Sequence, residues 1–85
     1  MLQKTVIVHI PNEHLKTATT FFIKKANEFC SHITVSRESN SVNAKSLLGL
    51  LSMQLEYGMP IELSAEGDDA EAALAALEQV LHPAE

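Results

Sequence analysis

The apolar residues of this chain alternate between two spacings, and each spacing predicts one kind of secondary structure. An apolar residue at every second position buries one face of a β-strand, whereas apolar residues three or four positions apart bury one face of a helix. Strand patterns, including one short return strand, occupy residues 4–10, 31–37, 41–43 and 60–66. Helical patterns occupy residues 16–29, a short run after Ser46, and the segment between Gly67 and Pro83. The predicted order is therefore β-α-β-β-α-β-α.

That order predicts an α+β fold of two layers, with the helices gathered on one face of the sheet. A chain of 85 residues has room for one domain, so residues 1–85 are expected to form it. The predicted inward residues share the apolar spacing of their element. They are Val6, Val8 and Ile10, then Ala18, Phe22, Ala26 and Phe29, then Ile61, Leu63 and Ala65, and finally Ala70, Leu74, Leu77 and Leu81.

Several residues mark where these elements begin and end. Asn40 tolerates a positive φ and is predicted to make the turn of a hairpin with Glu38 and Ser39. Ser46 precedes an apolar run and is predicted to cap a helix. Asp68 and Glu71 have the spacing of an acidic capping box at the last helix. Pro83 is predicted to end that helix.

Composition excludes several classes of function. The net charge is −5, which argues against a protein that binds nucleic acid or an anionic membrane by bulk charge. No apolar run is long enough to span a bilayer, and residues 1–10 lack the pattern of a signal peptide. The single cysteine, Cys30, forms no internal disulfide and is predicted to be a small core residue. A cytoplasmic, reducing location is therefore expected.

No pattern in the sequence predicts a metal site, a bound cofactor or a catalytic nucleophile. The four histidines do not have metal-ligand spacing with one another or with Cys30, and no glycine-rich phosphate loop is present. Two segments, 12–17 and 43–49, lie at predicted helix N-termini. Free N–H groups and the helix dipole favour an anion there. On the residues alone, Ser46 is better explained as a simple helix cap, because caps are common and phosphorylation sites are rare.

The segment Val42–Ser52, which reads V-N-A-K-S-L-L-G-L-L-S, resembles a motif of the HPr family of phosphocarrier proteins. The family's version is V-N-A-K-S-I-M-G-I-M-S. The resemblance extends over nearly the whole chain, including residues 22–29, 31–33 and 65–72. It implies an open-faced sandwich in which three helices cover one face of a four-stranded antiparallel sheet. It also implies a phosphocarrier of the sugar phosphotransferase system that is not a catalyst of its own.

The chain departs from this family in the phosphorylated loop. Family carriers read G-L-H-A-R-P, where the His takes phosphate from enzyme I and the Arg steadies the phosphoryl group. An ungapped alignment puts Leu15 at the His position and Thr17 at the Arg position, with Ala18 for the Pro and Glu13 for the Gly. A leucine has no nitrogen to phosphorylate. In this alignment phosphohistidine transfer is lost.

A shifted alignment keeps the alternative of a divergent phosphocarrier open. One deletion before the loop and one insertion within the first helix would bring His14 to the His position and Lys16 to the Arg position. His14 would then accept phosphate from enzyme I. Lys16 would supply a point charge rather than the planar fork of an arginine. Otherwise His14 is a solvated side chain of the loop.

The second segment is intact and resembles the site of phosphorylation in HPr and in its regulatory paralogue Crh, which also lacks the His. The matching serine in those proteins is modified by an HPr kinase/phosphorylase. The resemblance therefore implies phosphorylation at Ser46 and a role in catabolite repression, with the kinase and a transcriptional regulator or enzyme as partners. Lys16 and Lys45 are the candidate replacements for the missing arginine.

A short helix after Ser46 cannot bury every side of its leucine run. Leu50 is expected in the core, whereas the other leucines are expected to form an exposed docking surface. The predicted partner-binding residues are Leu47, Leu48, Leu51, Lys45 and Thr20. A third hypothesis is that the protein is a scaffold, which binds a partner through this surface and is not phosphorylated at all.

Overall fold

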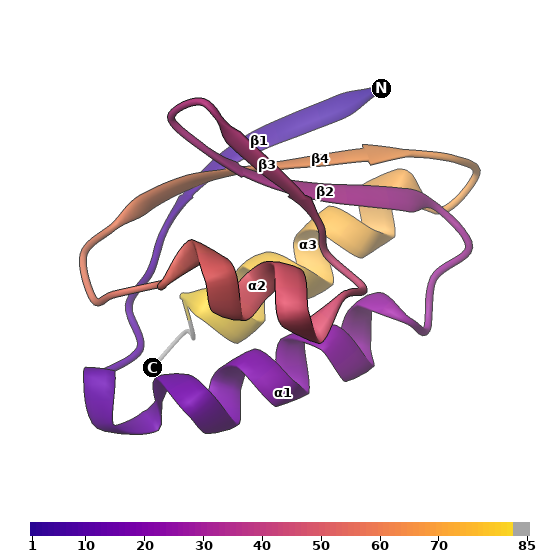
Figure 1. The fold of residues 1–85 in the computed structure, drawn as a ribbon. Coiled ribbons are helices and arrows are strands. Elements are labelled where there is room, and N and C mark those ends of the chain that lie inside the picture. The colour runs from indigo at the N-terminus through magenta and orange to yellow at the C-terminus, as the bar shows by residue number, and fades with distance from the viewer. Residues whose placement is uncertain (83–85) are drawn as a thin grey trace.

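The computed structural model describes residues 1–82, and within them the predicted order of strands and helices is confirmed. Figure 1 shows the four strands as one layer and the three α-helices as another. The elements are β1 Leu2–Ile7, a 3-10 turn η1 Asn12–His14, α1 Leu15–Ala26, β2 His32–Arg37, β3 Asn40–Asn43, α2 Leu47–Met53, β4 Pro60–Glu66 and α3 Ala70–Leu81. Pro83, which is predicted to end the last helix, lies outside the described residues.

The sheet has the strand order β1-β4-β2-β3, and every neighbouring pair is antiparallel. The register pairs Val6 with Ile61, and it pairs Val35 with both Leu63 and Val42. Directly paired residues point to the same side of a sheet, so these side chains line a single face. All three α-helices lie on one side of this sheet (Figure 1), which confirms the open-faced sandwich.

The hydrophobic core fills the space between the sheet and the helices. The predicted inward residues of β4 and α3 are buried, and so are Val6, Val8 and Ile10. Phe22 and Ala26 bury the predicted stripe of α1, whereas Ala18 and Phe29 are partly buried against it. Among residues 1–82, no helix combines the length and apolar character needed to cross a bilayer.

The first strand is shorter at its C-terminal end than its alternation predicts. Pairing with β4 stops at Ile7, although the strand pattern continues to Ile10. Beyond Ile7 the chain finds other partners, since Val8 N–H donates to Met59 O at 2.9 Å and His9 N–H donates to Leu81 O at 2.7 Å. The apolar face therefore stays buried after the regular strand pairing ends. Alternation in the sequence indicates which residues are buried, but it does not show where the strand pairing stops.

The prediction that Cys30 is a core residue is wrong, because its side chain is exposed. α1 ends at Ala26, three residues earlier than predicted, and the chain then runs through a connection to β2. In this connection Ser31 is the buried residue, with 1% of its surface exposed. Free cysteines are usually buried, but the backbone after α1 turns the side chain of Ser31, and not that of Cys30, toward the interior.

The capping box at α3 is also absent. The residue before the helix is Asp69, and its side chain makes no cap hydrogen bond. Its carboxylate instead accepts hydrogen bonds from the amides of Cys30 and Ser31, at 2.8 and 2.9 Å, and from the Ser31 hydroxyl. The N-cap position is thus one residue later than the predicted Asp68, and the carboxylate there accepts long-range hydrogen bonds instead of capping the helix.

The hairpin between β2 and β3 turns at Glu38 rather than at Asn40. Arg37 pairs with Asn40, which leaves Glu38 and Ser39 as a two-residue loop. Glu38 has the positive φ, at 54°, and Asn40 belongs to β3. The prediction placed the positive φ on Asn40, two residues beyond the position that needs it. The two turn types that are favoured in two-residue hairpin loops both have a positive φ at the first position, which is Glu38 here.

Replacing Glu38 by asparagine is expected to stabilise the fold by about 0.5 kcal/mol, because Asn enters the left-handed region at lower cost than Glu. Urea denaturation should show a higher midpoint with an unchanged slope. Ser39→Asn is the matched control, since Ser39 does not have a positive φ. Equal midpoints for Glu38→Asn and the wild type would contradict this account of the turn.

Candidate functional site

Two backbone amides at the start of α1 already donate hydrogen bonds to backbone carbonyls. The turn η1 leads directly into α1, and His14 N–H donates to Pro11 O at 2.8 Å. The amide of Leu15 donates to the carbonyl of Asn12. An anion bound at a helix N-terminus needs amides that have no such partner. The first amides of this helix are therefore less available than the sequence predicts.

Leu15 is directed toward the interior rather than toward solvent. Its side chain is half-buried and packs against the hydrophobic core. Together with Leu51 and Leu55, it lines a shallow groove of 220 Å³ between α1 and α2. The position that the ungapped alignment matches to the family's histidine therefore holds an apolar side chain packed against the second helix.

The polar side chains around this entrance are exposed and do not form a cluster. His14 directly precedes α1 but makes no side-chain cap hydrogen bond. Glu13, Lys16 and Thr17 are also exposed. Thr20, one turn further along, donates its hydroxyl to the Lys16 carbonyl at 3.2 Å. Within residues 1–82, no hydrogen bond or ion pair connects the side chains of His14 and Lys16.

Ser46 caps α2, as the sequence predicts. It has extended backbone angles, and its Oγ accepts a hydrogen bond from Gly49 N–H at 3.1 Å. A Cβ on Gly49 would lie 3.2 Å from Val42 Cβ and 3.4 Å from Ser46 Oγ. Glycine therefore lets the start of α2 lie close to Val42 of β3. Ser46 is half-buried, and the cap holds its oxygen at the end of the helix. The cap uses Oγ as an acceptor, which leaves the hydroxyl proton outside this bond.

The side chain of Lys45, directly before the cap, is hydrogen-bonded to the connection that follows α1. Its Nζ donates to the Phe29 carbonyl at 2.8 Å, and its backbone N–H donates to Asn43 Oδ1 at 2.8 Å. Cations near a helix C-terminus are favourably placed for such bonds. The ammonium group is thus engaged within the fold and half-buried, which the sequence does not reveal.

The two candidate segments lie at opposite ends of the α1–α2 pair. The first turn of α1 and the last turn of α2 line the same groove, through Leu15 and Leu51. At the other end, Lys45 before α2 contacts Phe29 after α1. The helices therefore run antiparallel, as Figure 1 shows. The structure does not bring Leu15 and Ser46 into one site.

The leucines after Ser46 divide between the core and the surface, as expected. Leu50 is 2% exposed, whereas Leu47 is 48%, Leu48 is 80% and Leu51 is 49% exposed. Three exposed leucines on two helical turns make an apolar patch on α2, which we call the leucine patch. Scattered surface leucines are ordinary in proteins, but a contiguous patch of them is typical of a binding surface.

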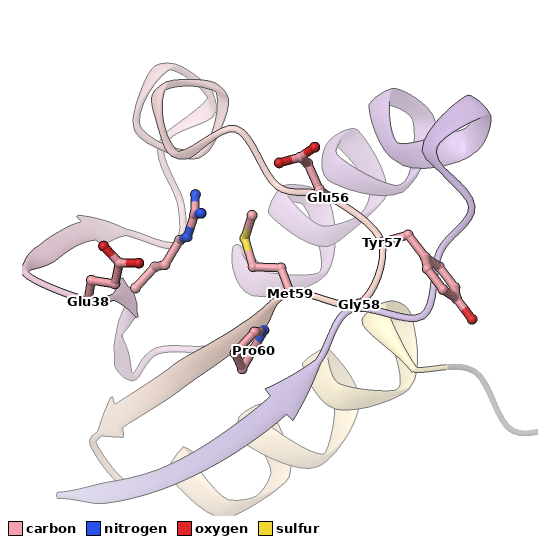
Figure 2. A pocket seen from close by; sticks show the side chains of 7 residues that line it. Glu38, Glu56, Tyr57, Gly58, Met59 and Pro60 are labelled. Atoms are coloured by element: carbon pink, nitrogen blue, oxygen red, sulfur yellow. The ribbon is translucent and has the colours of Figure 1, made fainter.

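A larger pocket lies elsewhere and was not predicted from the sequence. It has a volume of 390 Å³ and lies between the β2–β3 turn and the loop after α2. Figure 2 shows Glu38 and Glu56 on its two sides, with Met59 between them and the Tyr57 ring pointing away. It contains neither Ser46 nor His14. In the part of the chain that the structure describes, no group of three or more His, Cys, Asp or Glu residues could hold a metal ion.

Comparisons with known proteins agree with this architecture. Residues 2–82 match the family described as PTS HPr component phosphorylation site. The chain is 37% identical over 82 residues to the phosphocarrier protein HPr of Borreliella burgdorferi, covering 95% of this chain and 94% of that protein. It is 35% identical over 77 residues to the HPr-like protein Crh of Halalkalibacterium halodurans, covering 91% and 92%.

Solved structures of HPr proteins are also similar to this chain. The crystal structure of an HPr from Bacillus anthracis matches with a TM-score of 0.91 and 34% identity, covering 95% of this chain and 96% of that one. Identities to HPr and to Crh are close to each other, at 37% and 35%. Overall similarity therefore does not separate a carrier from its regulatory paralogue, and the residues of the site have to do so.

Proposed function

The chain belongs to the HPr family of the phosphotransferase system, whose members are phosphocarriers rather than catalysts, and from this premise we propose that it is a regulatory, Crh-like member. In this proposal Ser46 accepts a phosphoryl group, and no histidine transfers one. The protein acts in the cytoplasm as a signal in catabolite repression. The observation that carries the proposal is the contrast between an intact Ser46 cap and a leucine at position 15.

The entrance of α1 supports the loss of phosphohistidine transfer. Leu15 offers no nucleophilic nitrogen, and its side chain is packed against the core. The first amide of the helix is bonded to Asn12 O, so it is not free to steady a phosphoryl group. Thr17 supplies no positive charge where family carriers have an arginine. Each of these features removes a different requirement of the carrier reaction.

The geometry of Ser46 supports its role as phosphoacceptor. In the reaction with ATP, the Ser46 oxygen forms a bond to the γ-phosphorus, the bond between that phosphorus and the β–γ bridging oxygen breaks, and the hydroxyl proton is released. The products are phosphoserine and ADP. The added charge is about −1.5 to −2, and it lies at the positive end of the α2 dipole. This position of the charge offsets part of the cost of introducing it.

The first test is intact-mass spectrometry after incubation with an HPr kinase/phosphorylase and ATP. We expect one added phosphate on the wild type and none on Ser46→Ala, because the acceptor oxygen is missing. Ser52→Ala is the matched control, since Ser52 lies on the same helix and is exposed; it should be modified normally. Failure to modify the wild type while an ordinary HPr is modified would end this proposal and leave the divergent carrier and the partner-binding scaffold.

A divergent carrier is the second candidate, and the position of His14 favours it. His14 is exposed and directly precedes α1, so an incoming phosphoryl donor can reach its ring. This candidate requires an acid-labile phosphate from enzyme I and phosphoenolpyruvate that is lost in His14→Ala. The regulatory proposal expects no such label, and its appearance would replace that proposal with the carrier function.

The leucine patch is proposed as the docking surface for the kinase and for the regulator or enzyme that reads the signal. It starts at the first residue of α2, directly after Ser46, so one partner can contact both the serine and the patch. Thr20 of α1 and Lys45 are proposed to lie at its edge. Lys45 contributes to a partner only when its ammonium leaves the Phe29 carbonyl.

Replacing Leu51 by glutamate is expected to raise the KM of the kinase for this protein about tenfold, which corresponds to about 1.4 kcal/mol of lost binding. Stability should change by less than about 0.5 kcal/mol, because Leu51 is half exposed. Ala72→Glu, at an exposed position on α3, is the matched control. An unchanged KM for Leu51→Glu would show that the patch is not part of the kinase contact.

A further inference from the structure

The connection between α1 and β2 is held by other elements at a single peptide group. The carbonyl of Phe29 accepts from Lys45 Nζ at 2.8 Å, and the N–H of Cys30 donates to Asp69 Oδ2 at 2.8 Å. These two atoms belong to the same peptide unit, between residues 29 and 30. One side chain is that of Lys45, two residues before the start of α2, and the other is that of Asp69, directly before α3. The peptide therefore links two helix starts that are far apart in the sequence.

The two bonds of this peptide support each other. A cation at its oxygen polarises the unit and makes its N–H a better donor, which strengthens the bond to the carboxylate. Lys45 is half-buried and its partner oxygen is neutral, so a nearby anion would compete for it. A phosphate adds the Coulombic attraction between opposite charges, which a neutral carbonyl oxygen does not supply.

Ser46, the neighbour of Lys45, is where such an anion arises. We propose that phosphorylation of Ser46 draws the Lys45 ammonium from the Phe29 carbonyl to the phosphate. The peptide between residues 29 and 30 then loses one hydrogen bond, and its other bond, from the Cys30 amide to Asp69, becomes weaker. This rests on the proposed phosphorylation of Ser46. Lys16, the other candidate for the missing arginine, lines the groove at the far end of the helix pair. Lys45 is thereby the residue that connects the state of Ser46 to the α1–β2 connection and to Asp69.

Nuclear magnetic resonance of the full chain tests this coupling, with phosphoserine incorporated at position 46 during synthesis so that no kinase is needed. We expect the Phe29 carbonyl carbon to move upfield, toward its position in unphosphorylated Lys45→Met, because it loses a hydrogen bond. The Cys30 amide, at the other end of the peptide, should exchange with solvent severalfold faster. An unmoved Phe29 carbonyl in the phosphorylated wild type would overturn the proposal without reference to any variant.

The Lys45→Met variant separates this route from a general effect of the added charge. Phosphoserine in this background should leave the Phe29 carbonyl where it is, since the bond is already gone. In Lys16→Met, the matched control at the other end of the helix pair, phosphoserine should shift it as in the wild type. An equal shift in Lys45→Met and the wild type would show that Lys45 is not the link. Failure of a kinase to modify Ser46 would instead count against the proposed function.

Discussion

Replacing Gly67 by alanine is expected to lower the free energy of unfolding by about 3 kcal/mol, through overpacking and an unfavourable backbone conformation together. A Cβ at this position would lie 2.6 Å from Ser31 Oγ and 2.8 Å from Ser31 Cα. The second contact is with backbone, so rotating a side chain cannot relieve it. Ser31 cannot withdraw either, because it is buried and hydrogen-bonded to Asp69. The φ of 150° at Gly67 adds a second cost for any side chain.

Urea denaturation of Gly67→Ala beside Gly58→Ala measures the steric part of this effect. Gly58 also has a positive φ, at 85°, but a Cβ there would meet nothing within 4 Å. Gly58→Ala should therefore show only the conformational cost, about 1 kcal/mol. Similar losses in the two variants would mean that the chain around Ser31 moves aside and that the close approach is not a constraint.

The second large effect is expected at Asp69, whose carboxylate holds the connection that Gly67 approaches. In Asp69→Asn, one of the two acceptor oxygens becomes an NH₂ group that faces existing donors. One carboxylate oxygen accepts from the amide and hydroxyl of Ser31 and the other accepts from the amide of Cys30, so either orientation of the asparagine amide places its NH₂ group against at least one N–H donor. An unsatisfied buried donor carries its full desolvation penalty. The loss of stability should exceed that of Glu78→Gln, which breaks only the exposed ion pair with Lys4.

The pH dependence of stability gives a separate readout for the same carboxylate. The Ser31 hydroxyl, with further contributions from the amides of Cys30 and Ser31, lowers the pKa of Asp69 below its ordinary value of 3.8 against the opposing effect of burial. A carboxyl whose pKa is lower in the folded state stabilises the fold fully above its unfolded pKa. That stabilisation is lost as the pH falls through the lowered folded value.

Chemical denaturation of the wild type and Asp69→Asn across acidic pH tests this assignment. The stability difference should be constant near neutrality and should shrink as the pH drops below the ordinary range of an aspartate. Glu71→Gln, an exposed carboxyl in the first turn of α3, is the matched control and should show no comparable change. A difference that does not depend on pH would mean that the ionised form of Asp69 is not what the amides bind.

Much of the fold follows from the sequence by itself. The alternation in residues 60–66 identifies Ile61, Leu63 and Ala65 as inward, because strand geometry fixes which side chains share a face. The same local reasoning places the cap at Ser46, since the donor of its hydrogen bond lies three residues away. The motif at Val42–Ser52 and the leucine at position 15 also carry the family and the proposed loss of phosphohistidine transfer.

Only the tertiary structure decided the features that depend on distant partners. Asp69 binds Ser31 across 38 residues, and Lys45 binds Phe29 across 16, so no local pattern could assign either side chain. The exposure of Cys30 and the separation of Leu15 from Ser46 likewise follow from how the helices pack. Periodicity in the sequence identifies which residues of one helix or strand share a face. Hydrogen bonds between distant residues depend on how the helices and strands are placed relative to one another.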